Sequence, residues 1–479
     1  MLEEILLDDP ARSKLGIYKH ILEIDPGEYP IHYFEKYTGY SHIKTANLLQ
    51  GMNRELQELS EGSRLLNEKD KVVVAKVIPS YQQYQQYLFS RGVPYGVLLE
   101  SLLHPQKDLK DFGKMSGLSQ SSLMRRLKPL VEYLKSKGIR LNCLQMEVTG
   151  RESAIRIMYF NFLWSVDFGT RLYAYFEKEL SQSLDGLLLS EDLVYLKYVE
   201  KREFNMYHGI SLLRTRQGYY VDEPQINQLI FPATNRKFKE ALAAEKVPET
   251  YQEREANFVN YIIFYWPQIF ATDDPRLAII KRQYKVLDDT RNCAAAFFER
   301  IKKELHVNGR SQQELLLLNL QTIFLRRQIL GGNVPKNLDF IIDSLKNQHP
   351  EFETLQTAIK EALSGIVPAD DVDDDLAGLL TIVCINVFHN EGPAEKVNIG
   401  IIGFPNHFLL YAMINRIERL PFVEFSLMNS ASLENYDAVI TCSRELLPAN
   451  TKNYWIVEGE ASFDAMDNFL FQLFKEKTL

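Results

Sequence analysis

Two segments of this 479-residue chain repeat one pattern: a glycine, a serine two positions later, and a helix-length run of apolar residues spaced four, three and four apart. The second copy holds Gly117, Ser119, Leu123, Leu127, Leu130 and Leu134. The first copy holds Gly39, Ser41, Thr45, Leu49, Met52 and Leu56. Glycine permits the positive φ of a tight turn, serine caps a helix, and this spacing forms one helical stripe. Each copy therefore predicts two helices joined by a short turn.

Short extended segments follow each helix pair. After the second pair, residues 139–142 and 145–149 are typical of a two-stranded hairpin. After the first pair, residues 64–66 and 71–78 flank a polar turn at 67–70. The chain thus predicts two winged helix-turn-helix units in tandem, and the repeat makes this prediction stronger than a single copy would.

The second unit carries three further predictions. Leu109, Phe112 and Met115 fall on one face of its first helix and are expected to face inward. Pro129 lies within the second helix, which predicts a kink or a restart there. Residues 81–87, YQQYQQY, place tyrosines three apart, and we expect them to pack along one side of a helix that opens this unit.

The charge distribution separates the second unit from the rest of the chain. The whole chain nets −8, which by itself disfavours nucleic acid as a partner, but residues 81–160 hold 12 Lys and Arg against 6 Asp and Glu. A basic module in an acidic chain is typical of a regulator that binds DNA. Residues 1–80 net −3, so a packing or dimerising role is the alternative for the first unit.

The outward faces of the two second helices carry the donors that a recognition helix brings to the major groove of double-stranded DNA. The candidate DNA contacts of the second unit are Ser119, Gln120, Ser121, Ser122, Arg125, Arg126, Lys128 and, on the wing, Arg140. Those of the first unit are Ser41, His42, Lys44, Thr45 and Asn47. Amphipathic helix pairs also pack without binding DNA, and this alternative stays open for either copy taken alone.

Several classes of protein are disfavoured by features that the chain lacks. The four cysteines are far apart and form no CxxC pair, which disfavours a disulfide framework or structural zinc. Without a signal peptide or an 18-residue apolar run, we expect a soluble, cytoplasmic protein that does not contact a membrane. The aspartate run at 370–375 lacks the glycine and glutamate of an EF-hand loop. No catalytic motif occurs, so we expect no enzyme, no metal and no cofactor.

Residues 167–390 are a series of amphipathic segments with short breaks, enough for two all-helical domains. Two histidines in this stretch, His208 and His389, are candidates for phosphorylation, because an imidazole nitrogen can accept a phosphoryl group that resets an interface. The alternative for each is a helix cap or a hydrogen-bonded core histidine.

The sequence changes character after Pro393. Strands are predicted at 397–402, 423–428, 438–441 and 454–457, and helices at 407–419 and 463–475. This alternation predicts a parallel sheet with helices packed against it. The loop after the first strand, residues 403–406, holds no Cys, Ser or Lys, and Cys442 is expected to be a buried structural thiol.

The chain resembles the Mga/AtxA-type family of transcriptional regulators of Gram-positive bacteria, including its MafR-like members. The resemblance covers essentially the full length. It is most specific in Gly117-Leu118-Ser119-x-x-Ser122-Leu123-x-Arg125-x-Leu127 and in Gly150-Arg151-Glu152-x-x-Ile155-Arg156, which looks like the exit from a winged unit.

The resemblance implies a mainly α, multidomain architecture. Winged helix-turn-helix domains would occupy residues 1–80 and 81–165, PRD-like helical domains 166–278 and 279–392, and an EIIB-like α/β domain 393–479. It also implies a global activator that forms homodimers or higher oligomers and is modulated by the phosphotransferase system. The phosphocarrier protein of the phosphotransferase system would phosphorylate His208 and His389. RNA polymerase is a further implied partner. The EIIB-like domain departs from that pattern because residues 403–406 lack the phosphocysteine.

Two other hypotheses remain. A phosphocarrier or EIIB-like enzyme of the phosphotransferase system would need a reactive thiol or histidine, and the loop after the first strand counts against it. A helical scaffold that does not bind DNA would leave Arg125 and Arg126 as solvated surface residues.

Overall fold

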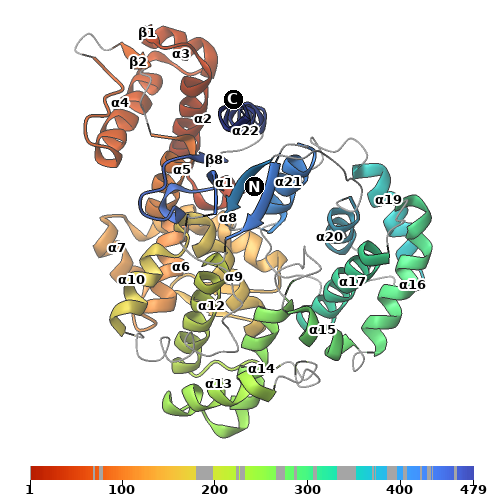
Figure 1. Ribbon diagram of the computed structural model, residues 1–479. Coiled ribbons are helices and arrows are strands. Elements are labelled where there is room, and N and C mark those ends of the chain that lie inside the picture. Colours follow the sequence, from red (N-terminus) through yellow and green to blue (C-terminus); the bar gives the residue numbers. More distant parts are fainter. Residues whose placement is uncertain are drawn as a thin grey trace. The chain divides into compact units, whose positions relative to one another are not determined.

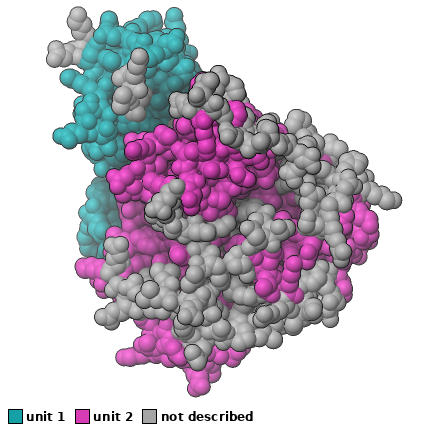
Figure 2. Space-filling view, in the orientation of Figure 1, with its two compact units in different colours: residues 1–135, 140–148 teal, residues 136–139, 149–479 magenta. Residues whose placement is uncertain are grey.

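The computed structural model is mainly helical, with a small parallel sheet near the C-terminus (Figure 1). It describes residues 2–67, 71–74, 79–179, 198–222, 226, 232–265, 274, 276–284, 288–305, 310–331, 352–368, 372, 374–385, 396–402, 407–420, 423–428, 433, 435–457 and 461–478. The chain divides into two compact units (Figure 2): Met1–Lys135 with Arg140–Val148, and Ser136–Ile139 with Thr149–Leu479. No helix among the described residues is long and apolar enough to cross a membrane.

The first compact unit begins with the elements of the predicted first winged helix-turn-helix. Its elements are α1 (Leu2–Leu6), α2 (Asp9–Glu23), β1 (Gly27–Tyr29), α3 (Ile31–Thr38), α4 (His42–Leu59) and β2 (Val72–Val74). Strand β1 pairs antiparallel with β2, and Leu66 forms a further antiparallel bridge to Val72. The sequence did not predict β1, because this strand has only three residues, is largely exposed and shows no apolar alternation.

The second winged helix-turn-helix follows in the same unit. Its elements are α5 (Tyr81–Arg91), α6 (Val93–Leu103), α7 (Leu109–Ser116), α8 (Gln120–Ser136), β3 (Arg140–Asn142) and β4 (Glu147–Thr149). Strands β3 and β4 are hydrogen-bonded to one another, which confirms the predicted wing.

The repeated turn has the predicted geometry in both copies. Gly39 and Gly117 end their helices at φ +71° and +69°, and an added Cβ would meet nothing within 4 Å at either position. Glycine is therefore required by the backbone angle and not by space. The Ser41 hydroxyl accepts a hydrogen bond from the Lys44 amide, and the Ser119 hydroxyl accepts one from the Ser122 amide, so both caps are confirmed.

The two apolar stripes are buried as predicted. Every one of the eight inward residues is at most 1% exposed: Thr45, Leu49, Met52, Leu56, Leu123, Leu127, Leu130 and Leu134. The structure corrects two details of the second unit. Met115 is 60% exposed, because the inward stripe of the eight-residue α7 is complete with Leu109 and Phe112. Helix α8 runs continuously through Pro129, since the buried leucines on either side hold it in place despite the local cost of proline.

The second compact unit contains two groups of packed helices. The first group is α9 (Glu152–Asp167), α10 (Thr170–Glu179), α12 (Tyr198–Arg216), α13 (Pro232–Ala244) and α14 (Glu249–Tyr265). The second group is α15 (Leu277–Tyr284), α16 (Asp288–Leu305), α17 (Arg310–Leu330), α19 (Phe352–Leu363) and α20 (Asp374–Ile385). Phe297, Leu320, Ile359 and Leu380, from four different helices, meet in one apolar core of the second group.

The C-terminal elements form a four-stranded sheet in the order β6-β5-β7-β8, with every neighbouring pair parallel. They are β5 (Val397–Ile401), α21 (His407–Glu418), β6 (Val423–Leu427), β7 (Ala438–Thr441), the 3₁₀ turn Arg444–Leu446, β8 (Tyr454–Ile456) and α22 (Ala461–Thr478). The strands predicted after Pro393 are confirmed. β5 lies inside the sheet, where Val397, Ile399 and Ile401 are fully buried.

Candidate nucleic-acid interface

The first turn of α8 presents a hydroxyl-rich, exposed surface. Ser119, Gln120 and Ser121 are exposed and Ser122 is half-buried. The Ser119 hydroxyl lies 3.1 Å from the hydroxyls of both Ser121 and Ser122. Because the helix N-terminus also carries partial positive charge, this end of α8 suits an anionic partner such as a DNA phosphate.

The two adjacent arginines of α8 have different surroundings. Arg125 is exposed and forms no ion pair with any described residue. Arg126 is half-buried, and its Nη1 lies 3.0 Å from Oδ2 of Asp8, the N-cap of α2. Sequence reasoning treated the two as equivalent, because the partner of Arg126 lies more than a hundred residues away in the chain. Arg125 is therefore available to a ligand, whereas Arg126 is already bound within the protein.

The other basic candidates of the second unit are on the surface. Lys128 is exposed, with its Nζ 3.7 Å from Oε1 of the exposed Glu132. Arg140 is exposed at the start of β3, on the wing. The wing turn is held to α7 by a hydrogen bond from the Leu109 amide to the Leu144 carbonyl, at 2.9 Å. α8 and the wing thus both carry basic side chains that are exposed at the surface.

The corresponding face of α4 is more occupied. His42 Nδ1 lies 2.6 Å from a carboxylate oxygen of Glu35, and Lys44 Nζ sits 3.3 Å from the centre of the Tyr40 ring. Ser41 and Asn47 are exposed. Thr45 is fully buried and donates its hydroxyl to the Ser41 carbonyl, so in this structure it is a core position and not a surface contact.

Two apolar side chains on these faces were missed by sequence reasoning. Ile43 is 74% exposed in the first turn of α4, and Met124 is 41% exposed on α8. Both follow from the helical register, since each lies outside the buried stripe of its own helix. Exposed methyl groups at such positions can contact the methyl group of thymine.

Residues 79–163 match the family model of the Mga helix-turn-helix domain. The chain carries an Mga-type DNA-binding domain. The matched segment contains α5 to α8, both wing strands and most of α9, and it supports an Mga-type family member. No curated protein matches the chain. The domain indicates a DNA-binding regulator.

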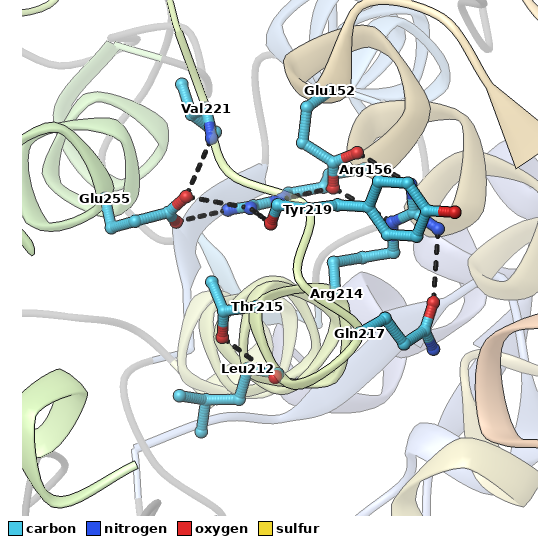
Figure 3. A network of polar contacts seen from close by, with 9 residues as sticks. All are labelled: Glu152, Arg156, Leu212, Arg214, Thr215, Gln217, Tyr219, Val221 and Glu255. Carbon is cyan, nitrogen blue, oxygen red and sulfur yellow. Dashed lines mark hydrogen bonds and ion pairs between the residues drawn. The ribbon is translucent and has the colours of Figure 1, made fainter. Parts of the chain in front are cut away.

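A buried network of four charged side chains starts at the helix that follows the wing (Figure 3). Arg156 of α9 donates to Glu152 at 2.9 Å and to both carboxylate oxygens of Glu255 at 2.5 and 2.9 Å. Arg214 of α12 donates to both oxygens of Glu152 at 2.9 and 2.7 Å. Glu255 of α14 also accepts the Val221 amide at 2.8 Å. The network therefore ties α9 to both α12 and α14.

The charges of this network compensate one another. Burial alone would raise the pKa of Glu152, but hydrogen bonds from Arg214 and the charge of Arg156 lower it below its ordinary value. Burial alone would lower the pKa of Arg156, and Glu255 and Glu152 raise it instead. Glu152, Arg156 and Arg214 are thereby stabilised in their charged forms, and removal of any one of them would leave an uncompensated charge in the interior.

His208 lies on α12, the helix that contributes Arg214 to this network. It is 1% exposed and packs between the rings of Phe204 and Phe238, with centroids 5.9 and 5.7 Å away. Neither ring nitrogen has a hydrogen-bond partner among the described residues. Burial lowers the pKa of His208 to about 4, so the imidazole is neutral at pH 7. His389, the other phosphorylation candidate, lies outside the described residues.

The C-terminal sheet shows no exposed thiol in its described part. Cys442, which follows β7, is buried, and burial raises its pKa well above the ordinary value. The loop at 403–406 lies outside the described residues. Nor do the described residues contain a group of three or more His, Cys, Asp or Glu side chains that could hold a metal ion.

Substitution of Arg156 tests the buried network. Arg156→Met leaves Glu255 and Glu152 without their partner, and we expect it to lower the free energy of unfolding by about 3–5 kcal/mol. Arg254 lies on the same helix as Glu255 and forms a partly exposed ion pair with Asp222, so Arg254→Met is the matched control. It should lower the free energy of unfolding by less than about 1 kcal/mol. Urea titration followed by fluorescence of the buried Trp164 on α9 measures both. Equal losses would contradict the proposed compensation.

The neutral state of His208 predicts a pH dependence of stability. Its pKa is lower in the folded state than in the unfolded chain, so the unfolded state binds the proton first. The neutral, buried imidazole therefore contributes to the free energy of unfolding fully above pH 6.5, and this contribution is lost as the pH falls toward 4. At pH 5 the loss from this group should be about 2 kcal/mol relative to pH 7. Urea titrations of wild type and His208→Leu at both pH values should show a smaller loss in the variant; parallel losses would argue against a buried neutral imidazole.

Proposed function

We propose that this chain is a cytoplasmic transcriptional regulator of the Mga type, a global activator that binds double-stranded DNA and has no enzymatic role. The observation that carries the proposal is the exposed first turn of α8, with the unpaired Arg125, inside the segment that matches the Mga helix-turn-helix domain. The alternative of a scaffold that does not bind DNA gives no reason for a capped, hydroxyl-rich helix end beside an unpaired arginine.

The proposed binding mode assigns a role to each exposed candidate. Helix α8 enters the major groove, where Gln120 and Arg125 contact base edges. Lys128 and Arg140 contact the phosphate backbone, as do the hydroxyls Ser119, Ser121 and Ser122. Arg126 instead holds α8 to Asp8. In the first unit, Ser41, His42, Lys44 and Asn47 provide a second and weaker set of contacts, because two of them already have partners within the protein.

The two adjacent arginines give a matched test of this binding mode. Arg125→Ala should weaken binding to duplex DNA about tenfold and reduce the slope of affinity against salt by about one. Asp8→Asn, which keeps the cap of α2 and releases Arg126, should weaken binding less than Arg125→Ala does. Gel-shift titrations of the intact chain at several salt concentrations measure both effects. If Arg125→Ala binds as wild type does, or if binding does not respond to salt, the proposal is wrong.

We further propose that the second compact unit regulates this binding. Residues 166–278 and 279–392 would be PRD-like domains and residues 393–479 an EIIB-like domain that supports a homodimer or higher oligomer. The phosphocarrier protein of the phosphotransferase system would phosphorylate His208 and His389, and the bound activator would contact RNA polymerase. The buried Cys442 argues against a role for the last domain as a phosphocarrier itself.

The surroundings of His208 suggest how phosphorylation would act. A phosphoryl group carries nearly two negative charges and cannot remain between Phe204 and Phe238. Because Phe204 lies on α12 itself, modification would hold α12 away from Phe238 of α13. Because Arg214 of the same helix binds Glu152, displacement of α12 would also release the first turn of α9, which follows the wing in the chain.

Phosphotransfer provides the test of this regulation. Incubation with the purified phosphotransfer cascade and labelled phosphoenolpyruvate should label wild type, and His208→Ala should lose part of the label and His208→Ala/His389→Ala all of it. His20→Ala, outside the proposed regulatory domains, is the control and should label as wild type does. Label that survives the double substitution would exclude these two histidines as the sites.

A further inference from the structure

The three tyrosines of α5 each bind a glutamate of the first winged unit. The Tyr81 hydroxyl donates to Glu3 at 3.1 Å, Tyr84 to Glu55 at 2.6 Å and Tyr87 to Glu58 at 2.7 Å. We call these three pairs the tyrosine–glutamate clasp. Sequence reasoning expected the tyrosines to pack along one side of their helix; their hydroxyls also connect the two winged units.

Further contacts reinforce the clasp from both sides. Glu55 also pairs with Lys14 of α2, and Glu58 pairs with Arg91 of α5 at 2.7 Å. Gln85 donates to Glu3 at 2.8 Å. These additional partners mean that each glutamate is held by more than one side chain, so the clasp is a network and not three separate hydrogen bonds.

The centre of the clasp is continuous with the apolar core. Tyr84 is fully buried against Tyr18 of α2, with ring centroids 4.6 Å apart, and the Tyr18 hydroxyl donates to the Pro79 carbonyl. Burial, together with the neighbouring glutamates, raises the pKa of all three clasp tyrosines. The hydroxyls therefore remain protonated donors at physiological pH, and the contacts between the two winged units persist there.

The clasp holds the helix that carries the candidate contacts of the first unit. Glu55 and Glu58 lie near the end of α4, and His42 and Lys44 lie in its first turn. An α-helix of this length is stiff, so fixing one end fixes the direction of the other. Helix α8 is tied to the same unit by its own contact, from Arg126 to Asp8. Helix α4 is thus held to α5 and α2, and α8 is held to the N-cap of α2. Side-chain contacts, in addition to the chain itself, therefore connect the two candidate recognition helices.

We propose that the clasp fixes α4 and α8 as one bipartite DNA-reading surface, in which Tyr81, Tyr84 and Tyr87 are positioning residues that set the spacing between the two contacted DNA segments. The proposal rests on the DNA binding proposed above. It gives the first unit a definite part in that binding despite its negative net charge: its contacts add selectivity for spacing, because they form only when the second DNA segment lies at the fixed separation.

The test uses DNA duplexes selected by the intact chain from a random 40-base-pair pool, with the two protected segments located by hydroxyl-radical footprinting. Insertion of 5 or 10 base pairs between the segments should weaken wild-type binding about tenfold or more, since a rigid reader cannot engage both segments at the new spacing. In the triple variant Tyr81→Phe/Tyr84→Phe/Tyr87→Phe, the penalty for insertion should fall below about threefold.

Tyr29→Phe is the matched control, because the Tyr29 hydroxyl donates to the Asp25 carbonyl within the first unit, and it should keep the wild-type penalty. If the triple variant does not fold, the surface variant Glu58→Gln should show a penalty between those of wild type and the triple variant. A wild-type penalty below about threefold, or an unchanged penalty in a folded clasp variant, would overturn this inference while leaving Arg125-dependent binding intact. Absence of all DNA binding would instead overturn the proposed function.

Discussion

The ion network around Arg156 is the interaction on which the arrangement of the helices after the wing depends. A guanidinium with no exposed surface is costly to bury, and it is tolerated here because Glu152 and Glu255 neutralise it and Arg214 restores the balance. Hydrophobic packing alone would tolerate small shifts between helices, whereas charge-assisted hydrogen bonds at these distances require one alignment. The network therefore specifies how α9, α12 and α14 meet.

The same network gives a physical meaning to one segment that the sequence singled out. In Gly150-Arg151-Glu152-x-x-Ile155-Arg156, the charged residues four apart face the interior on the first turns of α9. Through Glu152 they connect α9, most of which lies within the matched segment, to α12, the helix that carries His208. A displacement of α12 would have to break the hydrogen bonds that Arg214 donates to Glu152.

The two predicted winged units follow the same sequence pattern but differ in which polar side chains they expose. α8 keeps Arg125, Ser119 and Ser121 exposed, while His42 and Lys44 of α4 contact Glu35 and Tyr40 of the same unit. The tyrosine–glutamate clasp explains part of the acidity of the first unit, because three of its glutamates bind tyrosines of the second. Part of the negative charge of the first unit thus belongs to glutamates that bind within the protein. A count of charged residues in the sequence could not distinguish these from glutamates that would face DNA.

Local sequence alone determined the helix pairs, their glycine turns, their serine caps and their buried stripes. It also determined where the strands near the C-terminus lie along the chain. These features follow from residues three or four apart in a helix, or adjacent in a strand, and so are written in short stretches of chain. Tertiary structure decided which polar side chains remain available. Arg126 is bound to Asp8, Tyr84 to Glu55, and Arg156 to Glu255. Each partner lies far away in the sequence, and no local periodicity records it, because such pairs exist only once the elements have packed.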